Sequence, residues 1–253
     1  MRQSESRHSI PRLLADVNLA QRQGAKGLSV WPLLRTSRFM AGAQTPVTTL
    51  SQALEDGFVS VDEIPRGRGM SDIHLHNRAS DAVLVVHSEE LPGGRGTLLV
   101  DVSVLIPPSR GLLVAAHSTS AWLALDALRG SFQCVEGQIG FAAAIDDEIV
   151  GVELMADPGL FARSFSSLLR PYLADALSVD RGGVSPMALD PLFNAPEGFL
   201  EALADARVTR RAGSTRGWGR PLRIAGGRIS GCALEAGELI HLSAFPLEVA
   251  WAA

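Results

Sequence analysis

A histidine, two carboxylates and an arginine lie close together near the middle of the chain. The stretch VHSEELPGGRG, residues 86–96, holds His87, Glu89, Glu90 and Arg95. One glutamate could serve as a general base or hold a ligand hydroxyl, while Arg95 could bind an anion across the loop. Since exposed charges are usually solvated, the alternative is a set of loop charges without a specific role.

The two glutamates cannot share one task, because consecutive residues at a strand end point in opposite directions. We therefore assign the catalytic role to Glu89 or Glu90. Glycine allows backbone to approach a ligand closely. The predicted ligand-binding residues are Gly93, Gly94, Arg95, His87 and His117.

His74 and His76 form an H-x-H pattern on a predicted strand. Strand geometry places two such imidazoles on one face, about 7 Å apart. With His87 or His117 and a glutamate they could hold a metal ion. The alternation with Ile73 and Leu75 favours a simpler interpretation, two polar residues on the outer face of a half-buried strand. We expect no metal site and no cofactor.

The glycine-rich segments match no nucleotide-binding fingerprint. Gly93-Gly94-Arg95-Gly96 does not fit G-x-G-x-x-G between a strand and a helix, and neither G-x-x-x-x-G-K-[ST] nor G-x-S-x-G occurs.

Two apolar runs of strand length must position the central loop. They are Ala82–Val86 and Leu98–Ile106, and we expect both to lie centrally in a sheet. The strongest predicted helix, Pro158–Leu177, has apolar residues at i, i+4 spacing and should pack on that sheet. Pro171 within it predicts a kink or a break.

Other segments indicate short strands with a few helices. Helices are predicted over Pro11–Gln23, Thr49–Glu55, Ser120–Leu128 and Pro196–Ala206, and strands over Ser71–Asn77, Gly111–Ala116, Leu222–Ile224, Arg228–Leu234 and Leu239–Phe245, with a hairpin of Gly140–Ile145 and Ile149–Leu154. Helices and strands do not alternate regularly. The predicted fold class is therefore α+β, with a predominantly antiparallel or mixed sheet and a few packed helices.

Composition narrows the class of protein. The chain has 253 residues, 46% of them hydrophobic, and a net charge of −4, which gives no electrostatic case for nucleic acid. Two isolated cysteines, Cys134 and Cys232, suit a reducing compartment. Without a spanning apolar run or a signal-like N-terminus, we expect no membrane association and a cytoplasmic location.

The order of several segments resembles one family. These segments are Leu28–Leu34 (LSVWPLL), Thr49–Ile64, Asn77–Leu91, Gly93–Pro107, Glu136–Leu154, Tyr172–Leu177 (YLADAL) and His241–Pro246 (HLSAFP). Together they resemble the ARPP-1 family, the ARG and rhodanese-phosphatase-superfamily-associated protein domain. The resemblance covers residues 27–247 as a single domain, preceded by an extension over residues 1–26 with a short helix.

What the resemblance implies is a bacterial domain near NAD and ADP-ribose metabolism, because family members are associated with ADP-ribosylglycohydrolases. The chain resembles a divergent member. The family pattern resembles G-E-E-L-x-G-x-x-Q-N-R, of which this chain keeps Glu89, Glu90, Leu91 and Gly93 but not Q-N-R. After Val114 it also lacks the family's C-x-E-x-G-R-W-like segment.

Three functions follow from these observations. The first is a ligand-binding or regulatory protein for an ADP-ribose-like small molecule, with reduced or no catalysis. The second is a hydrolase of an ADP-ribose- or NAD-derived substrate, with a glutamate as general base. The third is a structural subunit that docks on a protein partner through its Arg- and Gly-rich segment.

Overall fold

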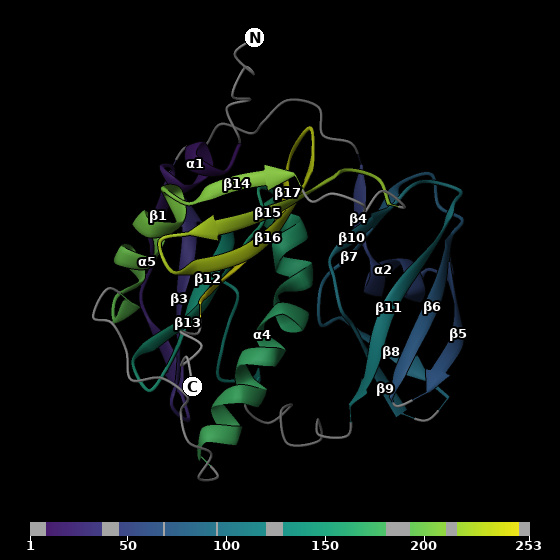
Figure 1. Ribbon diagram of the computed structural model, residues 1–253, viewed down its shortest axis with the longest axis horizontal. Coiled ribbons are helices and arrows are strands. Elements are labelled where there is room, and N and C mark those ends of the chain that lie inside the picture. Colours follow the sequence, from purple (N-terminus) through teal and green to yellow (C-terminus); the bar gives the residue numbers. More distant parts are fainter. Residues whose placement is uncertain are drawn as a thin grey trace, which may run out of the picture.

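Two lobes lie side by side in the molecule (Figure 1). The structure, a computed structural model, describes residues 9–36, 46–67, 69–94, 96–119, 129–180, 193–210 and 217–247. We call residues 46–119 the small lobe and the other described residues the large lobe. The small lobe is inserted between β3 (Leu28–Arg35) and β12 (Gln138–Ile145), which pair directly with each other.

One antiparallel sheet forms the large lobe. Its strand order is β1-β3-β12-β13-β17-β16-β15-β14, and β2 also pairs with β3. The remaining strands are β1 (Val17–Leu19), β2 (Gln23–Ala25), β13 (Glu148–Leu154), β14 (Arg207–Arg210), β15 (Arg220–Gly226), β16 (Ile229–Ala236) and β17 (Glu238–Pro246). The predicted β12–β13 hairpin is confirmed, and its turn residues Asp146 and Asp147 have φ of 50° and 65°, as in a type I′ turn.

Helices cover both faces of this sheet. On one face, α4 (Pro158–Asp180) buries Phe161 and Phe165 edge-on against Phe141 of β12. On the other, α1 (Ser9–Leu14) and α5 (Pro196–Ala204) pack in a second core cluster. Within the described residues, no helix is long and apolar enough to cross a membrane.

Two smaller sheets form the small lobe. One has the order β10-β7-β4, from β4 (Val47–Thr49), β7 (Ala82–Val85) and β10 (Val104–Ile106), with β4 parallel to β7. The other has the order β5-β6-β11-β9-β8, from β5 (Val59–Gly67), β6 (Met70–Asn77), β8 (Glu90–Gly93), β9 (Gly96–Val100) and β11 (Gly111–Thr119). Thr49 is the N-cap of the helix α2 (Leu50–Glu55), and its hydroxyl accepts the Gln52 N–H.

The side chains of strand β7 contribute to two hydrophobic core clusters, one on each of its faces. Val83 and Val85 pack with β6, β9 and β11, whereas Ala82 and Leu84 pack with α4. All four residues are buried, which explains why the run reads as continuously apolar instead of alternating. The small lobe is therefore joined to the large one through a common core.

The predicted fold class is confirmed: the protein is α+β, with mainly antiparallel sheets, one parallel strand pair and four helices in the described part. The buried stripe of α4 is confirmed as well. The helix runs through Pro171 without the predicted break, because Leu168, Leu169, Tyr172 and Leu173 hold the turns on both sides of it in the core.

Two predicted elements are wrong, and one is outside the described residues. Leu98–Ile106 is not one strand, because β9 ends at Val100 and β10 begins at Val104 in the other small sheet. Pro11–Gln23 is not one helix, because strand pairing with β3 takes over from Val17 onward. The helix predicted over Ser120–Leu128 lies outside the described residues.

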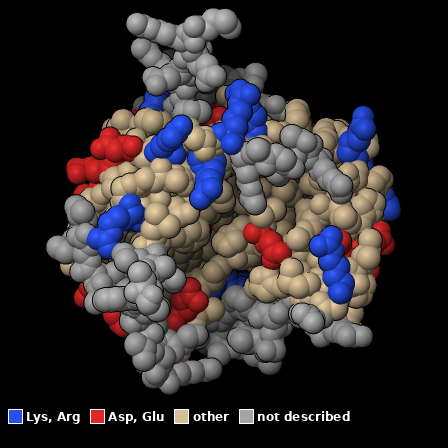
Figure 2. Space-filling view, in the orientation of Figure 1, with Lys and Arg blue, Asp and Glu red and all other residues tan. Residues whose placement is uncertain are grey.

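Figure 2 shows Lys and Arg side chains over the part of the large sheet where Figure 1 draws β14 and β15. The exposed arginines of these strands are Arg207, Arg210, Arg220 and Arg223. Since β14 is an edge strand, its charged residues oppose pairing with another chain.

Candidate functional site

A cavity of about 500 Å³ lies where the two lobes meet. The small lobe contributes His87, Asp101 and Ser103, and the large lobe contributes Trp218, His241 and Ser243. Apolar residues such as Leu105 and Phe245 complete the wall, and none of its described residues is Lys or Arg. A volume of this size is typical of a pocket for a small molecule.

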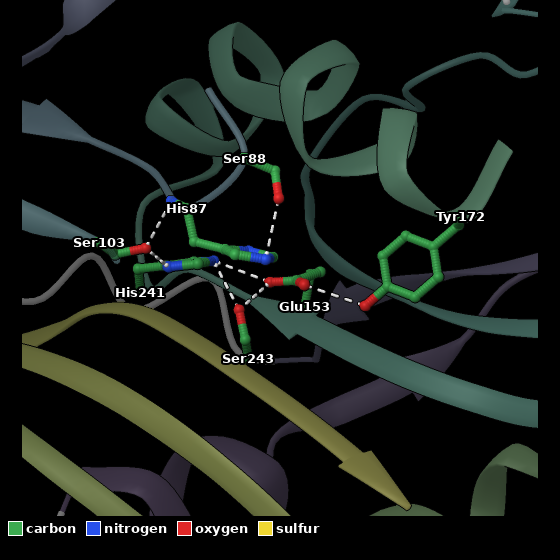
Figure 3. A network of polar contacts seen from close by, with 7 residues as sticks. All are labelled: His87, Ser88, Ser103, Glu153, Tyr172, His241 and Ser243. Carbon is green, nitrogen blue, oxygen red and sulfur yellow. Dashed lines mark hydrogen bonds and ion pairs between the residues drawn. The ribbon is translucent and has the colours of Figure 1, made fainter. Parts of the chain in front are cut away.

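Three side chains from distant parts of the sequence form a hydrogen-bonded chain at this cavity (Figure 3). The Ser103 hydroxyl lies 2.8 Å from His241 Nδ1, and His241 Nε2 lies 2.8 Å from Glu153 Oε2. Ser103 lies in the linker between β9 and β10, where the apolar run is interrupted by Asp101 and Ser103. This linker lies within the predicted strand Leu98–Ile106, and it carries part of the site.

Strand register places the other members of the network. Glu153 of β13 is directly opposite Ser243 of β17, and His241 lies two residues away on the same face. The Ser243 hydroxyl donates to Glu153 Oε2 at 2.5 Å, and the Tyr172 hydroxyl donates to Oε1 at 2.9 Å. Gly151 leaves room for Tyr172, since a Cβ there would lie 2.6 Å from the phenol oxygen.

Glu153 is fully buried, with 0% of its surface exposed, yet it has donors on both oxygens. Burial, followed by the nearby charge of Glu153, holds the pKa of Tyr172 well above its ordinary value, so the phenol stays protonated and donates. Hydrogen bonds of this kind stabilise a buried carboxylate.

The network assigns the His241 tautomer. If the Glu153 carboxylate accepts from Nε2–H, the neutral ring presents its lone pair at Nδ1 to the Ser103 hydroxyl. A hydroxyl, a ring nitrogen that can take its proton and a carboxylate that orients the ring are the parts of a nucleophilic triad. The arrangement can activate Ser103 for attack on a carbonyl carbon.

His87 is the predicted residue that lies at this cavity. Its Nε2 is 2.9 Å from the Ser88 hydroxyl, and its ring meets Phe245 edge-on. Burial lowers the pKa of His87, which favours the neutral ring. Its Nδ1 is buried without a hydrogen-bond partner among the described residues. The next residue, Ser88, has φ of 62°, an unusual conformation for a non-glycine residue.

His117, also predicted as a ligand-binding residue, does not line the cavity but contacts a residue that does. Its Nδ1 lies 2.7 Å from Oδ1 of Asp101, which lines the wall. The Asp101 N–H donates to Ala115 O, so β11 anchors the linker that carries Ser103.

The two predicted catalytic glutamates lie in the small lobe, away from the described wall of this cavity. Glu89 is 3% exposed and accepts from the Ser51 hydroxyl and from the Val86 N–H, both at 3.0 Å. Burial raises the pKa of Glu89 to about 7. Glu90 forms an ion pair with Arg170 of α4.

The predicted glycines form the end of the β8–β9 hairpin. The Gly94 N–H donates to Glu63 Oε2 at 2.8 Å, and a Cβ on Gly93 would lie 2.8 Å from Gly96 O. Arg95 lies outside the described residues. The structure therefore brings His87 to the cavity and leaves Gly93 and Gly94 at a separate turn.

His74 and His76 alternate with the fully buried Ile73 and Leu75, as the strand pattern predicts. Across the described ranges, no group of three or more His, Cys, Asp or Glu side chains could hold a metal ion.

Sequence reasoning missed Ser103, Glu153, Tyr172, His241 and Ser243. A usable signal exists for two of them, because Glu153 interrupts the apolar stretch IVGVELM and His241 interrupts LIHLSAF. A polar residue at a position that must be buried is more informative than a charged residue in a loop.

The comparisons with known proteins support one family. No curated protein and no solved structure matches the chain. The family model of the ARG and Rhodanese-Phosphatase-superfamily-associated Protein domain matches residues 16–119 and 113–245, which cover most of both lobes and every member of the polar network. The order of segments along the sequence and this match agree, and the chain belongs to the ARPP-1 family.

Proposed function

We propose that the protein is a hydrolase of small carbonyl compounds, with Ser103 as nucleophile, His241 as general base and Glu153 as the carboxylate that orients the base. One observation carries this proposal: the Ser103–His241–Glu153 chain has both hydrogen bonds at 2.8 Å, and Ser103 lines a cavity large enough for a small molecule.

The reaction follows from the positions of the protons. Ser103 Oγ attacks the carbonyl carbon of an ester or amide while its proton passes to His241 Nδ1. The imidazolium is stabilised by Glu153, and its Nδ1 proton then goes to the leaving alcohol or amine. A water molecule hydrolyses the resulting acyl-serine, with His241 again as base, and the carboxylic acid leaves.

The wall of the cavity restricts the substrate. Because no described residue of the wall is Lys or Arg, an anionic group would have no basic partner there, so the group that enters the cavity is not an anion. The link to NAD and ADP-ribose metabolism extends this proposal: for such a substrate, an uncharged acyl or amide end would reach Ser103 while the diphosphate stays outside.

The test is hydrolysis of p-nitrophenyl acetate, NAD and acylated ADP-ribose by the parent and by Ser103→Ala. We expect turnover in the parent and a loss of about a thousandfold in the variant. A fluorophosphonate should add to the parent, at Ser103, and not to the variant, as intact mass shows. Ser80→Ala, an exposed serine of the small lobe, is the matched control. Equal turnover in parent and Ser103→Ala would reject the assignment.

A general-base role of Glu89 or Glu90 is a competing proposal. A pKa of about 7 suits Glu89 for proton transfer at neutral pH, although its oxygens already accept from Ser51 and Val86. In the same assay, Glu89→Gln or Glu90→Gln would abolish turnover under this mechanism and leave it within about threefold under the serine mechanism.

One observation favours ligand binding without catalysis. The backbone N–H of His87 donates to Ser103 Oγ at 2.9 Å, and a donor on this oxygen lowers its nucleophilicity. In that case the cavity would serve a regulatory role for an ADP-ribose-like or other small molecule. Calorimetric binding of ADP-ribose or NAD, lost in Ser103→Leu, together with no hydrolysis and no fluorophosphonate adduct, would establish this second function.

A further inference from the structure

The segment Gly217-Trp218-Gly219 spans the two lobes at the cavity. The Trp218 N–H donates to Leu105 O at 2.8 Å, which ties the segment to β10 of the small lobe. A Cβ on Gly217 would lie 3.1 Å from Leu105 O, and one on Gly219 would lie 2.8 Å from Glu235 O of β16. Gly219 also has φ of +97°, so glycine is required there on two grounds.

These contacts fix the backbone of Trp218 while its side chain stays accessible. Trp218 lines the cavity and is 39% exposed, although large aromatic residues are usually well buried. An indole ring that is partly uncovered on a fixed backbone offers a surface to another aromatic ring.

The remaining wall agrees with an aromatic ligand that carries no negative charge. Val104, Leu105, Leu234 and Phe245 are apolar, and the described wall has neither Lys nor Arg. His87 Nδ1 is a buried polar atom without a partner in the described protein, so a polar substituent on the ligand would satisfy it.

We propose that the cavity selects aromatic esters and amides, with Trp218 as the residue that binds the ring and His87 as the residue that pairs with a polar ring substituent. This inference rests on the hydrolase proposed above for the choice of esters and amides. The aromatic selectivity itself rests on Trp218, His87 and a largely apolar wall without Lys or Arg, and it is testable without turnover.

The binding experiment uses Ser103→Ala, which cannot form an acyl-enzyme. Calorimetry should show naphthalene-2-carboxamide binding about tenfold more tightly than cyclohexanecarboxamide. Adding Trp218→Leu should remove this preference, whereas Trp218→Phe should keep it within about threefold. Phe58→Leu is the matched control, because Phe58 is an exposed aromatic residue, 48% exposed, outside the cavity wall.

His87 has a separate readout. Replacing it in the same background by His87→Leu should weaken naphthalene-2-carboxamide and leave naphthalene itself unchanged. Equal weakening of the two compounds would overturn the assigned role of His87.

The kinetic experiment separates the aromatic selectivity from the proposed hydrolase activity. With the parent, 2-naphthyl acetate should have a lower KM than cyclohexyl acetate. Trp218→Leu should raise the KM for 2-naphthyl acetate and leave the KM for cyclohexyl acetate unchanged. Aromatic selectivity in binding without hydrolysis supports the inference and rejects the hydrolase. No preference for the aromatic compound in the parent, or a preference that survives Trp218→Leu, overturns the inference. If the parent still hydrolyses either ester in that case, the hydrolase stands.

Discussion

Glu153 is the residue that joins most of the polar network. It accepts from Tyr172 and Ser243 and orients His241, while no part of it reaches solvent. A buried carboxylate of this kind is stable only as long as its donors are present.

Glu153→Gln should therefore harm both stability and chemistry. The new amide group would face donors where an acceptor is needed, which should lower the free energy of unfolding by about 1–3 kcal/mol. Because the ring of His241 would lose its orienting charge, esterase activity should fall by about a thousandfold. Urea unfolding and ester turnover measure the two effects. Tyr172→Phe is the control, since it removes one donor and keeps the charge; equal activity loss in both variants would contradict this view.

Glu89 gives the protein a pH dependence of its own. Its pKa rises from 4.5 to about 7 on folding, so the folded state holds the proton more tightly than the unfolded chain does. The stabilisation is complete below about pH 4.5 and is lost as the pH rises to about 7. The loss amounts to about 3 kcal/mol.

Glu89→Gln should remove this dependence. Its amide oxygen can accept the Val86 N–H and its amide nitrogen can donate to Ser51, so the contacts survive without a titrating group. The difference in unfolding free energy between variant and parent should grow in favour of the variant from pH 4.5 to pH 7.5. Urea midpoints across this range provide the measurement, and a constant difference would show that Glu89 does not titrate there.

Among the elements, α4 contributes most visibly to the core of the large lobe. Phe165 is 6% exposed and lies edge-on to Phe141, with Phe161 beside it. Phe165→Ala should cost about 3–5 kcal/mol, because the cavity left in this cluster cannot close fully. Chemical denaturation of the variant tests this value, with Ser166→Ala as an exposed neighbour on the same helix. An unchanged midpoint would mean that the cluster is not packed as described.

Elements with a strong local pattern could be predicted, and those fixed by distant pairing could not. The stripe of α4 and the turn at Asp146-Asp147 are local signals, and both elements are confirmed. The interruption at Asp101 and Ser103 was missed because the linker is only three residues long, so two strands of different sheets look like one apolar run in the sequence. The region from Val17 to Ala25 was missed because its strands exist only through pairing with β3.

The candidate site was harder to predict than the fold for the same reason. His87 was found because it stands beside other polar residues, whereas Glu153 and His241 lie 88 residues apart and become partners only through the order of the strands. The spacing of these two residues along the sequence does not show that their side chains meet in the fold.

At the scale of the molecule, the two lobes should unfold together. One core cluster contains Leu84 and Leu105 of the small lobe and Phe141 and Phe161 of the large lobe. Separation would expose this cluster, so neither lobe is stable when the other is lost.

Hydrogen exchange during urea unfolding tests this expectation. Peptides from β6 in the small lobe and from β12 in the large lobe should become exchangeable at one urea concentration, and far-UV circular dichroism should have the same midpoint. Two midpoints separated by more than the width of one transition would show that the lobes are independent units.

The insertion of the small lobe between β3 and β12 has a consequence for the gene. The coding segments of the large lobe encode the proposed base and carboxylate, His241 and Glu153. The inserted segment encodes the proposed nucleophile, Ser103. A gene without the insertion would still specify the β3–β12 pair, but it would encode an acid–base pair with nothing to activate. The proposed chemistry therefore needs both coding segments, and deletion of either one removes it in one step.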